Sequence, residues 1–311
     1  RFALVVVISA PKAGKFYGNI NQGFTQTHRL ASTGRPILFS GTKRPRGVQF
    51  QNLPRKYKKL FTAHHDDYLC MEFDAAQLEF RVAADEGKDE VAKQEIITGY
   101  DVHSYTAKVL TEAGEPTSRQ EAKASTFAPL FGGGGKSDAQ RAYAKAFKEK
   151  YKGIAETQKG WTYEVLADGC LRTPYGMIFH WPGTKMSVTG YIDNTTSIYN
   201  YPIQGLATAE IIPIALVYFW HKSKHLRLQV FNTIHDSVCA RVHKDDIDEA
   251  KLIAKVTMTT DVYKFLSDVY NYDFSVPLGA GIKVAKHWGD SDTEELYVVF
   301  PDGKETYEIK T

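Results

Sequence analysis

Two carboxylates and two basic side chains, far apart in the chain, have the chemistry that a phosphate-transferring site needs. Asp74 opens the polar segment 74–81, Asp236 is the middle residue of a His-Asp-Ser triplet, and Arg119 and Lys123 lie four residues apart. Carboxylate oxygens are the ligands that Mg²⁺ prefers. Two such ions about 4 Å apart can bridge the oxygens of a transferred phosphoryl group, and nearby cations neutralise the leaving group. These residue types predict metal-assisted phosphate chemistry.

The segment before Asp74 has the alternation of a half-buried strand. Leu69, Met71 and Phe73 share one face of 68–74, and the polar or small side chains share the other. The strand is therefore expected to end at Asp74, on its polar face. From residue 77 the spacing becomes helical. A strand, the acid and then a helix would fix the carboxylate in space.

The two basic residues are expected on one helix. A capping box at 118–121 predicts a helix that begins at Arg119. Arg119, Lys123 and Phe127 recur every four residues, which stacks them on one face. Pro129 should kink or end the helix, because it lacks a backbone donor. Other spacings predict a helix over 138–151, irregular sheet and loop over 168–199, and a helix over 204–221 that is bent by a proline.

Two hairpins are expected near the C-terminus. Strands over 226–231 and 238–242 leave His235 and Asp236 in the tight connection between them. The stretch 296–307 carries a Pro-Asp-Gly turn between apolar runs and predicts a second hairpin.

Composition limits the class of protein. The chain has 311 residues, of which 43% are apolar, enough for one large domain or two interleaved ones. The longest apolar run, 3–8, predicts a buried strand and is far shorter than the ~20 residues of a membrane span. Three scattered cysteines suit a reducing compartment. We therefore expect a cytoplasmic protein, bacterial or in a phage-infected host, that crosses no membrane.

Charge is informative only locally. The net charge of +3 does not by itself predict nucleic-acid binding. Basic residues gather over 43–59, interleaved with Phe50 and Tyr57, as on a phosphate-facing surface or a solvated basic loop. The chain starts at Arg1, so we expect a fragment of a longer protein.

The three chemical segments, in this order, resemble motifs A, B and C of the family A DNA polymerases. The resemblance runs from about residue 11 to residue 288 and implies an α+β right-hand fold. Its palm would be an antiparallel sheet with flanking helices, over 1–84 and 191–290, and its fingers would be helical, over 85–190. Residues 291–311 would form a C-terminal hairpin extension, and thumb and exonuclease lie outside the chain.

The resemblance implies a role for each motif residue in joining a dNTP to a primer 3′-hydroxyl. Asp74, Asp236 and the backbone carbonyl of Ala75 would hold two Mg²⁺ ions, and Lys123 would also protonate the pyrophosphate. Glu79 would exclude a ribose 2′-hydroxyl, and a Phe at position 127 resembles members that reject dideoxynucleotides. The implied dNTP-binding residues are Gln77, Glu79, His103, Arg119, Lys123, Phe127 and Phe131.

The resemblance also implies contacts with primer-template DNA. The matching segments are 27–32, 51–55, 200–205 and the His of motif C. The DNA-binding residues carried over from them are Arg29, Gln51, Asn52, Asn200, Gln204 and His235.

Departures from the family pattern keep other functions open. Ser237 replaces the usual Glu of motif C, as in single-subunit phage RNA polymerases. This replacement favours an RNA polymerase or a ribonucleotide-tolerant enzyme. Glu79 opposes that alternative, because its side chain would exclude a ribose 2′-hydroxyl. Phe131 stands where a Tyr is usual. The missing thumb either belongs to an upstream segment or subunit, or leaves this chain with weak DNA binding, and a non-catalytic nucleic-acid-binding remnant is a third possibility. Motif B most resembles that of phage members, so a viral replicative enzyme is expected.

Overall fold

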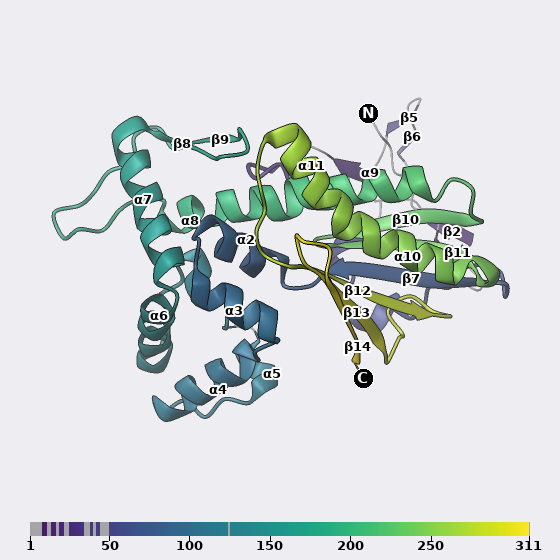
Figure 1. Cartoon of the computed structure of the whole chain (residues 1–311), viewed down its shortest axis with the longest axis horizontal. Coiled ribbons are helices and arrows are strands. Elements are labelled where there is room, and N and C mark those ends of the chain that lie inside the picture. The colour runs from purple at the N-terminus through teal and green to yellow at the C-terminus, as the bar shows by residue number, and fades with distance from the viewer. Residues whose placement is uncertain are drawn as a thin grey trace. The chain divides into compact units, whose positions relative to one another are not determined.

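The computed structural model describes residues 8–10, 14–16, 19–21, 25–33, 38–39, 42–43, 50–123 and 125–310. The chain divides into two compact units (Figure 1). The first, here called the sheet unit, comprises Arg1–Leu78, Ala207–Phe265 and Leu278–Thr311. The second, the helical unit, comprises Glu79–Leu206 and Leu266–Pro277. The expected α+β class is confirmed, with an antiparallel sheet and flanking helices.

The sheet unit is built on a six-stranded antiparallel sheet in the order β10-β11-β7-β12-β13-β14 (Figure 1). Its strands are β7 (Tyr68–Ala75), β10 (Leu228–Ile234), β11 (Ser237–His243), β12 (Leu278–Ala285), β13 (Glu294–Val299) and β14 (Glu305–Lys310). Both predicted C-terminal hairpins are present, and β7 has the predicted alternation. Met71 and Phe73 on its apolar face are fully buried.

Helices cover the apolar face of this sheet. α10 (Ile247–Met258) packs on β7, β11 and β12 and against α9 (Ile212–Lys222). The ring of Phe219 on α9 lies 4.6 Å from that of Phe73, measured between centroids. α11 (Thr260–Tyr270) follows α10 and leads out of the unit. Burial of this face fixes the register of β7 and so the face on which Asp74 points.

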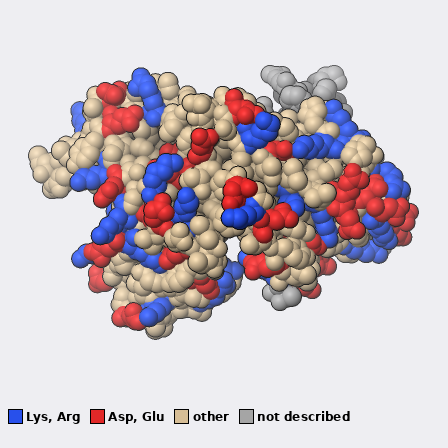
Figure 2. All heavy atoms as spheres, in the orientation of Figure 1, with Lys and Arg blue, Asp and Glu red and all other residues tan. Residues whose placement is uncertain are grey.

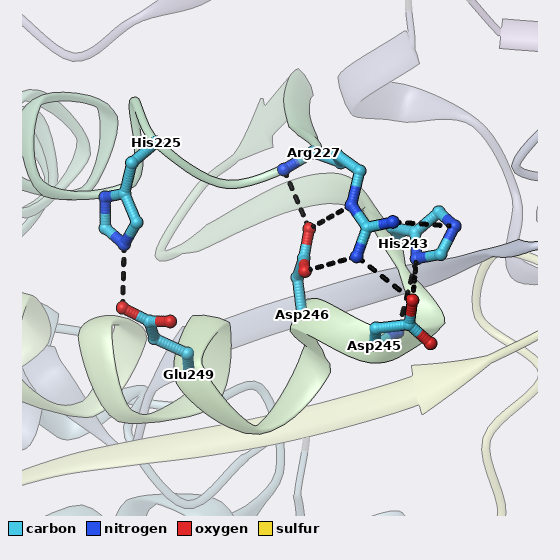
Figure 3. Close-up of polar contacts among 6 residues, drawn as sticks. All are labelled: His225, Arg227, His243, Asp245, Asp246 and Glu249. Atoms are coloured by element: carbon cyan, nitrogen blue, oxygen red, sulfur yellow. Dashed lines mark hydrogen bonds and ion pairs between the residues drawn. The ribbon is translucent and has the colours of Figure 1, made fainter.

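A polar network fixes the chain where it enters β10 (Figure 3). Arg227 donates from its backbone N and from Nε to Asp246 Oδ2, at 2.8 and 3.0 Å, and from Nη2 to Asp246 Oδ1 and Asp245 Oδ2, at 2.7 and 3.1 Å. Beside it, His225 Nε2 lies 2.7 Å from Glu249 Oε1 on α10. The start of the strand that leads to Asp236 is thus tied to the first turn of α10.

The described N-terminal part of the sheet unit forms small two-stranded sheets. β1 (Ile8–Ala10) pairs with β2 (Gly14–Phe16), β3 (Asn19–Asn21) with β4 (Ala31–Thr33), and β5 (Leu38–Phe39) with β6 (Thr42–Lys43). A 3₁₀ turn, η1 (Phe50–Asn52), and α1 (Arg55–Lys58) follow. The strand expected over 3–8 lies outside the described residues except for Ile8, and so does the 44–49 part of the basic segment.

The helical unit packs its helices around a core rich in aromatic residues. It contains α2 (Leu78–Glu86), α3 (Glu90–Thr98), α4 (Val102–Glu112), α5 (Arg119–Ala122), η2 (Pro129–Phe131), α6 (Asp138–Lys150), α7 (Lys152–Asp168), the hairpin of β8 (Cys170–Arg172) and β9 (Ile178–His180), and α8 (Thr195–Gln204). Phe80, Tyr143, Phe147 and Tyr151 are buried together, with neighbouring ring centroids 4.7 to 6.2 Å apart.

Three helix predictions need correction. The helix expected to carry Arg119, Lys123 and Phe127 ends at Ala122, and hydrogen-bonded turns follow it. Pro129 keeps a helix from continuing through 125–129, because its ring clashes with a helical carbonyl four residues earlier and it donates no hydrogen bond, but it does not account for the end at Ala122. No helix was predicted over 152–167, where α7 lies, and the helix expected from residue 204 begins at Thr195, within the region expected to be irregular. A π-helical stretch, Gly205–Ile211, precedes Pro213 in this helix, and the predicted bend stays a prediction.

One described helical stretch is long and apolar enough to cross a membrane. It is Thr195–Lys222, 28 residues with a mean hydropathy of 1.5 in its most apolar window, and 61% of that window is buried inside the protein. A buried core helix passes the same test of length and composition, so the stretch by itself does not indicate a membrane. Basic and acidic side chains are interspersed over the face that Figure 2 shows.

Candidate functional site

The sheet unit brings Asp74 and Asp236 together. β7 and β11 are antiparallel neighbours in which Ser237 pairs with Asp74. The Ala75 backbone N–H donates to the Asp236 carbonyl at 3.0 Å, which joins the end of β7 to the turn of the hairpin. Two acids that are 162 positions apart in the sequence therefore lie at the same end of adjacent strands, as the sequence predicted.

A strained turn presents the second acid. His235, exposed at the tip of the hairpin, has φ of 52°, in the left-handed region. Such a conformation gives the tight two-residue connection that twisted antiparallel strands favour. Ser237 closes the turn, because its Oγ donates to the Ile234 carbonyl at 3.1 Å while its own carbonyl accepts from Thr233 Oγ1 at 3.1 Å. The position of Asp236 is thus fixed on both sides.

The electrostatics of this end of the sheet leave negative charge in excess. Burial raises the pKa of Asp74 to about 7; the Lys283 ammonium opposes the shift, and the carboxylates of Glu294 and Asp236 add to it. Burial also raises the pKa of Asp236, and the Arg29 guanidinium opposes that shift. Carboxylates whose ionised forms are disfavoured in this way are stabilised when a divalent cation binds them.

The donor set fits a hard divalent cation. Within the described ranges, no group of three or more His, Cys, Asp or Glu side chains could hold a metal by itself. An ion here would use the two aspartates and complete its shell with a backbone carbonyl such as that of Ala75, water or phosphate oxygens. That is how Mg²⁺ is usually held, because it keeps several waters and few protein ligands.

The helical unit gathers several of the predicted dNTP-binding residues. His103 Nδ1 lies 2.9 Å from Thr126 Oγ1, and its ring lies 5.8 Å from that of Phe127. Phe127 is half-buried against Phe80, with ring centroids 5.2 Å apart. Burial and then the Arg119 charge lower the pKa of His103, and the Lys123 charge acts in the same direction. Basic and aromatic groups thus share one surface of the unit.

The family model for DNA polymerase family A matches residues 3–290 of this chain. The chain belongs to DNA polymerase family A. It is 26% identical over 295 residues to the thermostable DNA polymerase I of Thermus filiformis, covering 89% of this chain and 33% of that protein. It is 27% identical over 304 residues to DNA polymerase I of Lactococcus lactis subsp. lactis (strain IL1403), covering 88% and 31%.

A solved structure has the same fold. It is the POL domain of Pol1 from M. smegmatis in complex with DNA primer-template and dNTP, with a TM-score of 0.72 and 20% identity, covering 91% of this chain and 50% of that one. The chain spans about a third of the length of the curated relatives named above. The predicted family is thus confirmed. The relatives named above are bacterial, so the phage origin that motif B suggested is not shown.

A carboxylate that the sequence reasoning missed stands beside Ser237, where family A usually has Glu. Ser237 Oγ lies 3.3 Å from Glu72 Oε1 on the neighbouring strand β7. Trp288 Nε1 donates to Glu72 Oε2 at 3.0 Å, and Lys58 Nζ lies 3.7 Å from Oε1. Glu72 could have been found in the sequence, since it precedes Asp74 by two positions and shares its strand face.

The remaining dNTP-site predictions lie near the motif A turn and in motif B. Gln77 is exposed in the turn between β7 and α2, with φ of 50°. Glu79 is half-buried in the first turn of α2, and Phe131 is half-buried at the end of η2. Their roles stay predictions.

The predicted DNA-binding residues are partly used within the protein. Gln51 accepts from the Ser32 N–H at 2.6 Å and donates to the Thr233 carbonyl at 3.0 Å, which ties β4 to β10. Asn200 on α8 has an enclosed Oδ1 without a hydrogen-bond partner among the described residues. Asn52 and His235 are exposed, and Arg29 and Gln204 are half-buried. The structure thus gives Gln51 a folding role, and the DNA contacts remain predictions.

Proposed function

We propose that this chain carries out template-directed DNA synthesis, transferring dNMP from dNTP to a primer 3′-hydroxyl and releasing pyrophosphate. The observation that carries the proposal is the meeting of Asp74 and Asp236 at one end of adjacent strands, with negative charge in excess. Membership of DNA polymerase family A supports it. The M. smegmatis structure is a complex with primer-template DNA and dNTP, which supports the same substrates for this chain.

The metal-binding residues would be Asp74, Asp236 and the Ala75 carbonyl, holding two Mg²⁺ ions. When bound, these ions would activate the primer hydroxyl and neutralise charge that develops on the triphosphate. The carboxylates hold their part of the site by geometry: Asp74 ends a buried strand, and Asp236 is fixed by the turn hydrogen bonds. The backbone that carries both acids is thus held in place before the ions bind.

Residues of the helical unit would bind the triphosphate and the sugar. Lys123 is exposed just after α5, and its ammonium group would donate a proton to the departing pyrophosphate as a general acid. Arg119 would hold the triphosphate through its guanidinium fork. Phe127, supported by Phe80, offers a ring face to the sugar and base, and Glu79 would occupy the space of a 2′-hydroxyl.

Ser237 favours one alternative, synthesis with ribonucleotides, because its hydroxyl replaces the usual third carboxylate of motif C. Primer extension with dNTP and with rNTP separates the two proposals. A preference for dNTP of more than about 10²-fold supports Glu79 as the residue that excludes a ribose 2′-hydroxyl, and equal use of both substrates overturns that role.

We further propose that the chain is a phage replicative member of the family and acts in the cytoplasm. This proposal rests on the Phe-x-Pro-Leu-Phe-Gly sequence of motif B.

Substitution of Asp236 tests the proposed function directly. Asp236→Ala should lower primer extension by more than about 10³-fold, while the dissociation constant for primer-template DNA changes by less than about twofold, because phosphate contacts and not the acid supply DNA affinity. Asp245→Ala, which removes an exposed acid two residues beyond β11, is the matched control and should leave extension unchanged. Extension by the Asp236→Ala variant at the wild-type rate would overturn the proposal.

A further inference from the structure

The C-terminal hairpin is an integral part of the sheet unit. β13 pairs with β12, and β14 pairs with β13 (Figure 1). Helices hold the hairpin as well: Lys251 pairs with Glu295, Lys255 Nζ lies 2.7 Å from Glu305 Oε2, and the Tyr263 hydroxyl donates to the Val299 carbonyl at 2.9 Å. The family model ends at residue 290, so the hairpin lies beyond the part of the chain that it matches.

The first residue of the hairpin reaches the side of Asp74. In the pairing of β12 with β7, Gly281 stands opposite Asp74. A Cβ atom at Gly281 would clash with Glu294 Oε1 and would lie 3.4 Å from Asp74 Oδ1. The Glu294 carboxylate therefore fills the space that the missing side chain leaves, next to the metal-binding acid.

A lysine joins the two carboxylates. Lys283 Nζ lies 3.2 Å from Glu294 Oε1 and 3.8 Å from Asp74 Oδ1. Its side chain is 38% exposed, and those of Asp74 and Glu294 are 29% and 23% exposed. Water therefore screens the three charges only in part, and each charge acts on the other two.

We propose that Lys283 is an exchangeable counter-ion for Asp74, held in place by Glu294. The ammonium group neutralises Asp74 in the absence of a divalent ion and shifts fully to Glu294 when an ion binds the aspartate. Both residues are positioning residues that set how tightly the site takes its ion. The inference rests on the proposed function, because it concerns the ions that Asp74 would hold, and it gives the hairpin a role in that site.

The exchange makes opposite predictions for the two residues. Without Lys283, an entering ion no longer competes with an ammonium group, so binding should tighten. Without Glu294, Lys283 keeps Asp74 as its remaining carboxylate partner in this cluster, so binding should weaken. Partly exposed charge pairs at these distances have modest effects, and we expect about a fivefold change in each direction.

Mn²⁺ binding to the full chain without DNA, followed by the electron paramagnetic resonance signal of the free ion, measures this affinity. Lys283→Met should lower the Mn²⁺ dissociation constant about fivefold, and Glu294→Gln should raise it about fivefold. In the Lys283→Met background the effect of Glu294→Gln should be at least twofold smaller, because the competing ammonium group is gone. As a second readout, Lys283→Met should lower the Mg²⁺ concentration that half-saturates extension.

Neighbouring residues supply matched controls. Lys286→Met removes a lysine three residues on, 3.7 Å from Asp66, and Glu295→Gln removes the hairpin acid that pairs with Lys251. Both should leave the Mn²⁺ dissociation constant within twofold of wild type. The inference is overturned if Lys283→Met also leaves the Mn²⁺ dissociation constant within twofold of wild type. It is overturned as well if Glu294→Gln changes this constant equally in wild type and in the Lys283→Met background.

Asp74→Asn separates failure of this inference from failure of the proposed function. If Asp74→Asn abolishes Mn²⁺ binding and Lys283→Met leaves it unchanged, the metal site stands and the counter-ion role fails. If wild type binds no ion that depends on Asp74, the proposed metal site fails and the counter-ion role fails with it.

Discussion

Arg119 Nε lies 2.6 Å from Asp101 Oδ2, so the proposed triphosphate-binding cation is already paired with a carboxylate. The pairing holds the pKa of Asp101 well below its usual range, with help from the Ser104 hydroxyl and N–H. About half of each side chain is exposed, and such surface pairs contribute only about 0 to 1 kcal/mol. A triphosphate can therefore displace Asp101, at the cost of breaking this pair.

Asp101→Asn should strengthen nucleotide binding, because it frees Arg119 while keeping an N-cap for α4. Asp101 now caps that helix by accepting from the Ser104 N–H at 3.2 Å, which Asn can also do. We expect the KM for dNTP to fall about two- to fivefold in steady-state primer extension. Asp138→Asn, which breaks the exposed pair with Arg141 on α6, should leave KM unchanged. An unchanged or higher KM in Asp101→Asn would show that Arg119 does not hold the triphosphate.

Phe127→Tyr should admit dideoxynucleotides. The half-buried ring of Phe127 lies between Phe80 and His103, and a hydroxyl on it could replace the hydrogen bond that the substrate 3′-hydroxyl makes. A hydrogen bond to a charged group contributes about 1.5 to 3 kcal/mol, so the use of ddNTP relative to dNTP should rise about 10- to 100-fold. Competition of labelled ddNTP against dNTP in extension measures the ratio.

Phe131→Tyr is the comparison for this test, because it adds the same hydroxyl to the same segment at the end of η2. It should leave the ddNTP to dNTP ratio unchanged. Equal ratios in wild type and Phe127→Tyr would remove Phe127 from the sugar-binding position.

Local patterns in the sequence were sufficient for the parts of the site that one element carries. The alternation over 68–74 placed Asp74 at a strand end, and strands on both sides placed Asp236 in a hairpin turn. The capping box at 118–121 is present as predicted. Each of these features depends on residues within about ten positions, where propensity and period are informative.

Features that depend on distant residues could not be read in this way. The approach of Glu294 to Asp74 needs the register of β12 against both β7 and β13, which no local pattern records. α7 was missed because its buried face includes the polar Gln158 and Thr162, so the apolar period is weak. The helix from Arg119 ends at Ala122, and the four-residue spacing of Arg119, Lys123 and Phe127 gave no sign of this early end.

Glu86 makes the stability of the helical unit depend on pH. Burial, and then the charge of the neighbouring Asp85, raise the pKa of Glu86 to about 7. Between about pH 4.5 and 7 the native state therefore binds more protons than the unfolded state, and stability falls as pH rises through this window. Glu86→Gln removes the effect and should be about 3 kcal/mol more stable than wild type at pH 8, with little difference at pH 4.5.

Urea unfolding at the two pH values measures this difference. Glu90→Gln, at an exposed position in the first turn of α3, should show no such pH-dependent gain. A Glu86→Gln variant that is no more stable than wild type at pH 8 would contradict a raised pKa for the half-buried Glu86.

Gly153 should not tolerate a side chain, because α7 begins in close contact with the turn between α2 and α3. A Cβ atom at Gly153 would clash with the Gly87 carbonyl and would lie 3.0 Å from Asp89 Cα, and one at Gly87 would lie 2.8 Å from Ile154 N. These neighbours are backbone atoms, which cannot move aside as a flexible side chain does. Asp89 also accepts from the Ile154 N–H at 3.2 Å, so a shift of the helix would break that bond as well.

Gly153→Ala should therefore destabilise the protein by about 1 to 3 kcal/mol in urea unfolding, the usual range for overpacking. Gly160, seven residues later in the same helix, is the matched control, because a Cβ atom there would meet no other atom within 4 Å. Gly160→Ala should stabilise by about 0.5 to 1 kcal/mol, because alanine favours a helix interior and restricts the unfolded chain. The two Gly→Ala substitutions should change the free energy of unfolding in opposite directions only if α7 contacts the α2–α3 turn through Gly153. Equal effects would place that contact elsewhere.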